Sequence, residues 1–216
     1  SISYATKTVT KTYGDAAFTN AITNTGDGNV KYTSSNVNVA TVDVNTGKVT
    51  IVGAGTATIT ATVTDGTNYT YTTKTATYTL TVNKADNPVK VTSNTLTYNG
   101  NAQDLVTVSN INGNMCYSTS ASVTSCSSQG TIPTGTNAGT YTVYYYAAGN
   151  GNYKAKSGSV SVTINKANGS IEYKTVKVTK TYGDGAFTNE LTKTGDGTVK
   201  YTSSNVNVAT VNSSSG

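Results

Sequence analysis

The stretch TATITATVT, residues 56–64, decides the fold. Its apolar side chains, from Ala57 to Val63, occupy every second position, and threonine fills every position between them. Because successive side chains of a β-strand point to opposite faces of a sheet, this alternation predicts a strand with one buried and one solvent-exposed face. An amphipathic helix would instead place its apolar residues three and four positions apart.

The same alternation returns three more times along the chain. Apolar residues occupy alternate positions in residues 74–82, 141–147 and 160–164, and threonine, serine or tyrosine fills most positions between them. Strands with one apolar face form two sheets that pack face to face and bury those apolar faces between them. Short turns rich in Gly, Asn and Asp separate the strands and leave no room for helical crossovers. The pattern therefore predicts an all-β chain of Greek-key sandwiches.

The sequence of residues 1–47 occurs twice in the chain. They return as residues 170–216 without a gap, and only 13 of the 47 aligned positions differ. A repeat at a fixed offset indicates an array of modules. The differences fall where we expect solvent-facing side chains, whereas Tyr13, Phe18, Val30, Tyr32 and residues 39–42 are unchanged. The pattern therefore favours a scaffold over a chemical site.

Recurring tyrosines and joints set the module boundaries. Tyr13, Tyr98 and Tyr182 open successive units, and the joints TVNKA and TINKA end at Ala85 and Ala167. We therefore predict modules at residues 1–85, 86–167 and 168–216, joined by short Asn-Lys-Ala hinges. The last is half a sandwich, which should not fold alone. We expect further chain to complete it; strands from a neighbouring molecule, or packing alone, are the alternatives.

Composition removes several classes of function. The 15 basic residues are all lysine, scattered singly, and without arginine they do not predict a nucleic-acid surface despite the formal charge of +5. No apolar run approaches the ~20 residues of a membrane span. The opening SISYAT lacks the features of a signal peptide, so we expect a piece of a longer exported protein.

Cys116 and Cys126 are the only cysteines. If residues 115–119 and 123–127 were neighbouring antiparallel strands, a disulfide could join them. The loop-closure model gives such a bridge roughly 3 kcal/mol, and it would indicate an extracellular protein. Two unpaired thiols, or a metal or redox role, are the alternatives.

The stretch YTSSNVNVATVDVNTGKVTIVGAGTATITATV, residues 32–63, resembles bacterial Ig-like domains of group 2. The Tyr-Gly-Asp openings are similar to the related MBG/YDG-type modules. LTYNGNAQDLVT at 96–107, IPTGTNAGTYTVYYYAAGNGNY at 132–153 and SVSVTINKA at 159–167 also resemble the MBG group. The resemblance implies tandem Ig-like β-sandwiches that serve as spacers in secreted bacterial surface proteins, adhesins, or phage tail and decoration proteins.

Catalytic chemistry is not predicted. The chain has no histidine to carry protons near neutral pH, and most of its ten carboxylates sit in turns, where aspartate caps backbone groups. We expect no enzymatic activity, cofactor or metal site. Residues 43–47 superficially resemble the start of a calcium loop, but the other ligands are missing and a hairpin turn is the better interpretation. Weak calcium binding at a module junction, through Asp86 or Glu172, stays open.

Exposed tyrosines are the candidate ligand contacts. Tyr144 and Tyr146 flank an inward Tyr145, and Tyr69 and Tyr71 should be exposed in a similar way. Such rings stack on sugars or anchor a protein partner, although cross-strand packing is the alternative. Threonine ladders could bind ice, but sheet twist argues against a flat lattice match. Spontaneous Lys–Asn or Thr–Gln crosslinks between side chains also stay open.

Together these features predict a non-enzymatic spacer or stalk in a repetitive extracellular bacterial protein or fibre. Its partners would be neighbouring modules, copies of the same chain, or a cell-surface glycan or protein. We expect a secreted, cell-surface or phage-virion location, without membrane insertion. The alternative is an adhesin module that binds a glycan or protein through exposed tyrosines and loop tips.

Overall fold

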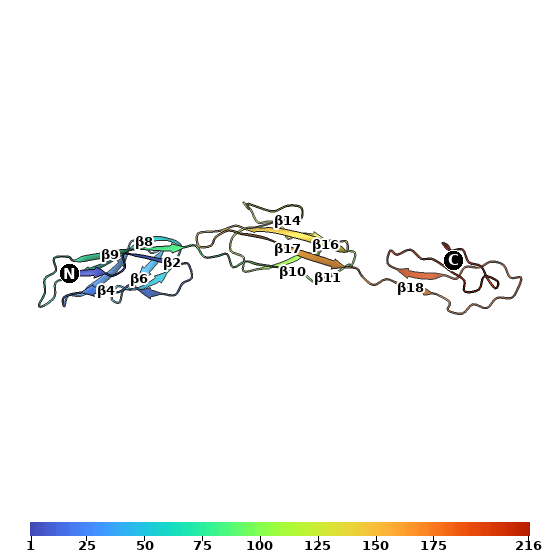
Figure 1. Cartoon of the computed structure of the whole chain (residues 1–216), viewed down its shortest axis with the longest axis horizontal. Helices are drawn as coiled ribbons and strands as arrows, with labels where there is room; N and C mark the ends of the chain where they lie inside the picture. Colours follow the sequence, from blue (N-terminus) through green and yellow to red (C-terminus); the bar gives the residue numbers. More distant parts are fainter. The chain divides into compact units, whose positions relative to one another are not determined.

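The computed structural model describes residues 1–216 and contains strands, turns and loops but no helix (Figure 1). The all-β prediction is therefore confirmed. No segment forms an apolar helix of the length that spans a membrane. The chain divides into two compact units. One comprises Ser1–Asn94, Asp104–Gly135 and Tyr141–Val162, and the other comprises Thr95–Gln103, Thr136–Thr140 and Thr163–Gly216.

Residues 1–85, the first segment, form an Ig-like sandwich around one core. One sheet has the order β2-β9-β8-β5, in which β2 runs parallel to β9 and the other pairs are antiparallel. Its strands are β2 (Thr8–Thr12), β5 (Val30–Ser34), β8 (Gly55–Val63) and β9 (Thr75–Asn83). The other strands form the sheets β3-β7-β6 and β1-β4. They are β1 (Ile2–Tyr4), β3 (Phe18–Thr19), β4 (Ile22–Asn24), β6 (Ala40–Val42) and β7 (Lys48–Ile51).

The stretch that predicts the fold is the central strand β8. Its alternate side chains Ala57, Ile59, Ala61 and Val63 are buried. On the neighbouring β9, Leu80 and Tyr78 lie opposite Ala57 and Ile59, so the apolar halves of both strands face the core. The intervening threonines pair with each other on the opposite face, as the alternation predicts.

The core of the first segment joins the sheets through aliphatic and aromatic contacts. Leu80 and Val49, from different sheets, are both completely buried. Tyr4 packs edge-to-face on Tyr78 with ring centroids 4.7 Å apart. The Tyr78 hydroxyl is buried and has no hydrogen-bond partner among the protein atoms.

Residues 86–167, the second segment, repeat the same strand plan. Their largest sheet has the order β11-β17-β16-β14, and β11 runs parallel to β17 as β2 does to β9. Its strands are β11 (Leu96–Thr97), β14 (Met115–Ser118), β16 (Gly139–Ala147) and β17 (Lys156–Asn165). The remaining pairs are β10 (Lys90–Ser93) with β13 (Val106–Ser109) and β12 (Gln103–Asp104) with β15 (Thr134–Gly135). Met115, Val89 and Ala147 form a core cluster here.

Residues 170–216, the half copy, form only a single two-stranded sheet. β18 (Ser170–Tyr173) pairs with β19 (Leu191–Thr194) in the same register as β1 with β4. Ile171 is 63% exposed in the half copy, whereas its counterpart Ile2 is 3% exposed. Within residues 170–216, no second sheet covers these apolar side chains.

Candidate functional site

Tyr144 and Tyr146 lie on the same face of β16, next to the disulfide. Opposite them on β14 are Ser118 and Cys116, while Tyr145 lies opposite Tyr117. Tyr145 and Tyr117 pack against the core cluster. Because strand side chains alternate, Tyr144, Tyr146, Cys116 and Ser118 share the other face. We call these four residues the tyrosine face.

The tyrosine face is less open than the sequence predicts. Tyr144 and Tyr146 are both half-buried rather than exposed. Their flat rings remain partly accessible, which is compatible with contact to a sugar or a protein side chain. The face carries no carboxylate or lysine, so it offers hydroxyls and ring surface but no charge.

The predicted disulfide between Cys116 and Cys126 is present, with Cα atoms 5.5 Å apart. Residues 123–127 form a loop and not a strand, so the disulfide does not join two neighbouring strands. Their place beside β14 is taken by the end of the loop: the Gly130 amide donates to the Met115 carbonyl at 2.6 Å. The Met115 amide donates to the Gln129 side chain at 3.0 Å. The bridged loop therefore occupies polar groups at the edge of β14, which limits pairing with other chains.

Glycine at position 130 makes room for this close approach. A Cβ on residue 130 would lie 3.0 Å from the Met115 carbonyl oxygen and 3.2 Å from the Cys116 Cα. Those distances are tighter than ordinary van der Waals contact, so a side chain would require the loop or the strand to shift by a few tenths of an ångström.

The other candidate pair divides into one exposed and one buried tyrosine. Tyr69 is 55% exposed, as predicted, but Tyr71 is only 5% exposed. The Tyr71 hydroxyl donates to Asn24 Oδ1 at 2.6 Å and accepts from the Gly28 amide at 2.9 Å. The prediction of exposure for Tyr71 is thus wrong. The Tyr71 side chain joins its own loop to residues 24–28 through these hydrogen bonds, and it is not available as a ligand contact.

Glycines make room for the Tyr71 ring. A Cβ on Gly26 would lie 2.5 Å from the Tyr71 hydroxyl oxygen, and one on Gly28 would lie 2.7 Å from the ring. Asp65 fixes the other side, because its carboxylate accepts the Tyr71 amide at 2.8 Å and Lys74 at 2.7 Å. The Lys74 hydrogen bond is the main reason that the Asp65 pKa lies below its ordinary value.

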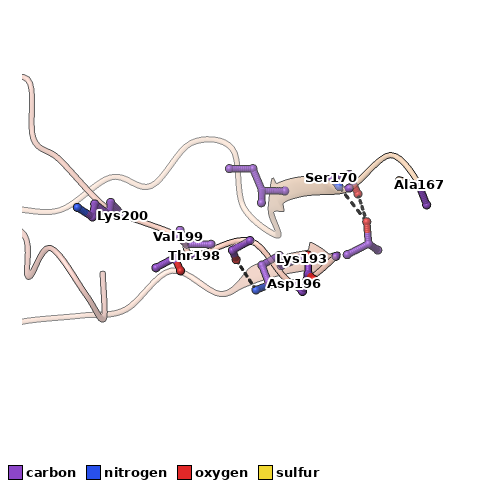
Figure 2. Close-up of a pocket in the computed structure, with 12 residues that line it drawn as sticks. Ala167, Ser170, Lys193, Asp196, Thr198, Val199 and Lys200 are labelled. Carbon is purple, nitrogen blue, oxygen red and sulfur yellow. Dashed lines mark hydrogen bonds between the residues drawn. The ribbon is translucent and has the colours of Figure 1, made fainter. Parts of the chain in front are cut away.

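A groove of about 470 Å³ lies in the half copy, between residues 167–171 and 193–200. Figure 2 shows Lys193 turned along it, with the ammonium donating to the Gly197 carbonyl at 2.7 Å. The equivalent surface of the first segment, at residues 24–28, holds the Tyr71 ring. The groove therefore corresponds to the surface that the Tyr71 ring covers in the first segment.

The carboxylates lie in turns. Asp43 accepts the amides of Asn45 and Thr46, and the Asp43 amide donates to the Lys48 carbonyl at 2.9 Å. Residues 43–47 are thus a hairpin turn, and hydrogen bonds led by the Thr46 amide hold the pKa of Asp43 below its ordinary value. The Asn68 amide does the same for the pKa of Asp27.

Neither carboxylate considered for calcium lies in a ligand cluster. Asp86 forms an exposed ion pair with Lys154 at 2.9 Å. Glu172 lies on β18 opposite Thr192. The structure contains no group of three His, Cys, Asp or Glu side chains placed to hold a metal ion.

Comparison with known proteins agrees in part with the resemblance noted above. Residues 13–67 match the family described as "Intimin, immunoglobulin-like domain". No curated protein matches the chain. The resemblance of residues 96–167 to MBG-type modules stays a prediction.

Several solved structures share the β architecture at low identity. Human protocadherin-24 EC1-2 is 14% identical, with 77% of this chain and 99% of that chain covered and a TM-score of 0.33. Surface layer protein SbsC, domains 1–6, is 15% identical over 89% of this chain and 35% of that chain, with a TM-score of 0.29. The Bacteroides ovatus glucan-utilization protein SGBP-B, in complex with a heptasaccharide, is 16% identical over 74% and 43%, with a TM-score of 0.27. Function must therefore be argued from the chain's own residues.

Proposed function

We propose that this chain is a structural spacer of a bacterial surface protein, in which repeated Ig-like sandwiches hold another part of the protein away from the cell. One observation carries the proposal. All five buried positions within residues 1–47 are unchanged in residues 170–216, and none of the 13 differences falls on a buried residue. Because every difference falls outside the buried positions, the pattern fits a unit kept for its fold.

The location and chemistry follow from the same proposal. The similarity of residues 13–67 to an intimin Ig-like domain and the disulfide support an extracellular site on a bacterial cell rather than on a phage virion. We propose that the chain has no enzymatic activity, because its carboxylates act as turn caps and pair with lysines. Its partners are neighbouring sandwiches or copies of the same chain.

A surface-display experiment tests the spacer role. The full chain is inserted between an outer-surface anchor and a peptide tag on an encapsulated bacterium, and antibody access to the tag is measured. We expect the chain to raise tag access above that of the anchor alone and above that of a Gly/Ser linker with the same number of residues, which behaves as a flexible coil. Equal access with and without the chain would overturn the proposal.

The tyrosine face supports a second candidate, an adhesin function. Tyr144 and Tyr146 present partly accessible rings side by side with the disulfide. A glycan array probed with the full chain tests it. Binding that is lost in Tyr144→Ala and Tyr146→Ala, but kept in the matched control Tyr98→Ala on another strand end, supports an adhesin. An array without signal refutes glycan binding.

A further inference from the structure

The linker after β9 is held by backbone hydrogen bonds. The Ala85 amide donates to the Asn152 carbonyl at 2.9 Å, and the Lys154 amide donates to the Ala85 carbonyl at 2.9 Å. Ala85 and Tyr153 thus form a parallel bridge. All these residues belong to one compact unit. A free hinge would leave the amide and carbonyl of Ala85 to water, whereas here both are paired within the protein.

Asn152 also reaches the first segment through its side chain. Its Oδ1 accepts the Ala54 amide at 2.9 Å, in the turn between β7 and β8. The loop that presents Asn152 is fixed in turn by Asn150, whose Oδ1 accepts the amides of Asn152 and Tyr153 at 2.8 and 2.9 Å. The Asn150 carbonyl accepts Lys84 Nζ at 2.7 Å. The loop 149–153 therefore bonds to both the linker and the β7–β8 turn.

Tyr13 adds an aromatic contact to the same loop. Its ring packs edge-to-face on Tyr153, with centroids 5.4 Å apart. The Thr12–Asp15 turn presents Tyr13: the Asp15 carboxylate accepts the Thr12 amide at 2.9 Å, and Gly14 has φ +93°, a left-handed value that favours glycine. Such ring pairs contribute about 0.5–1.5 kcal/mol beyond the area that they bury.

The half copy shows the same turn without a docked loop. Asp184 accepts the Thr181 amide at 2.9 Å and Gly183 has φ +97°, so the turn forms again. Its tyrosine, Tyr182, is fully exposed, whereas Tyr13 is half-buried. Local sequence therefore builds the turn, and Tyr13 is covered by contacts from elsewhere in the chain, namely the core of the first segment and the Tyr153 ring of the loop 149–153.

We infer that the Tyr-Gly-Asp turn is a docking site for the Gly-Asn-Gly-Asn-Tyr loop at 149–153, and that this contact makes residues 83–87 a fixed joint and not a hinge. The inference deepens the proposed spacer function, because a spacer with fixed joints resists bending. It differs from the expectation of a short Asn-Lys-Ala hinge at residues 83–85.

Amide hydrogen exchange of the full chain, followed by NMR, tests the joint. We expect the amides of Ala54, Ala85 and Lys154 to exchange at least tenfold more slowly than unprotected amides. Asn152→Ala should abolish the protection of Ala54, and Tyr13→Ala should speed exchange at Ala85 and Lys154. Tyr182→Ala is the matched control, since it removes the same tyrosine from the same turn where no loop is docked, and it should change none of the three.

Unprotected exchange at Ala85 and Lys154 in the unaltered chain, with the β8 and β9 amides still protected, would overturn the joint. That result would leave the sandwiches folded and the display experiment unaffected, so it is distinct from a failure of the spacer role. Equal effects of Tyr13→Ala and Tyr182→Ala would also contradict the docking.

Discussion

At the scale of single residues, tyrosines with similar sequence surroundings have different roles. Tyr69 is exposed, but Tyr71, two positions later, is buried and hydrogen-bonded through its hydroxyl. Loop side chains do not alternate between a buried and an exposed face, so the burial of Tyr71 could not be predicted from its position. Tyr71 is buried because its ring packs against the glycines at 26 and 28. Gly28 and Tyr71 are 43 positions apart, and sequence spacing alone does not show that such distant residues are in contact.

Tyr71→Phe should lower the free energy of unfolding of the first segment by about 1–3 kcal/mol, because Asn24 Oδ1 and the Gly28 amide would lose a partner in a partly buried site. Urea unfolding measures the change. Tyr69→Phe is the matched control and should have no effect. Equal stability of the two variants would mean that the Tyr71 hydrogen bonds do not stabilise the fold.

Tyr78→Phe should behave in the opposite way. The Tyr78 hydroxyl is buried without a protein partner, so its removal relieves a desolvation cost and should leave the fold as stable or stabilise it by up to ~1 kcal/mol. The same urea unfolding decides the point. A loss of more than ~1 kcal/mol would show that the hydroxyl has a partner after all.

Alkaline pH should unfold the first segment. Burial raises the pKa of Tyr78 from 10.0 to about 12, and burial together with the neighbouring Tyr78 raises that of Tyr4 further. Because the folded pKa exceeds the unfolded one, this stabilisation is complete below pH 10 and is lost as the pH rises toward and beyond 12. Thermal melts at pH 8, 10 and 11 would follow it, and Tyr78→Phe should reduce the loss.

At the scale of strands and loops, the long strands were predictable and the edges were not. Alternation identified β8, β9 and β16, because each has one face in a core. The parallel pairing of β2 with β9, the two-residue β3 and the loop along β14 were not predictable, because they depend on contacts between distant segments. At 123–127 the cysteine spacing suggested a strand, but Gln129 and Gly130 take the place beside β14.

Removal of the disulfide should weaken the second segment alone. The double variant Cys116→Ser/Cys126→Ser opens a loop with a sequence separation of 10, and the loop-closure model gives a loss of roughly 3 kcal/mol. Hydrogen exchange can follow the two segments separately. Protection at β16 should fall, whereas protection at β8 should not. An equal fall in both would show that the segments unfold as one.

At the scale of the whole molecule, we propose that the sandwiches of residues 1–85 and 86–167, most of which belong to one compact unit, unfold as two separate cooperative units under load. Their cores consist of different residues, from Ile2–Val82 in the first and from Val89–Ala147 in the cluster of the second. The disulfide lies in only one of them. Load applied to the ends of the chain should therefore unfold them one after the other.

Single-molecule force spectroscopy of the full chain tests this claim most directly. We expect two separate force peaks, one of which releases about 300 Å of chain for residues 1–85, at ~3.5 Å per residue. Reduction of the disulfide should lengthen only the unfolding step of residues 86–167, by about 30 Å. The ten residues that the disulfide spans can then extend, whereas the bridge holds the two cysteine Cα atoms 5.5 Å apart. A single peak, extension without resistance, or a step of 1–85 that lengthens on reduction would contradict the account.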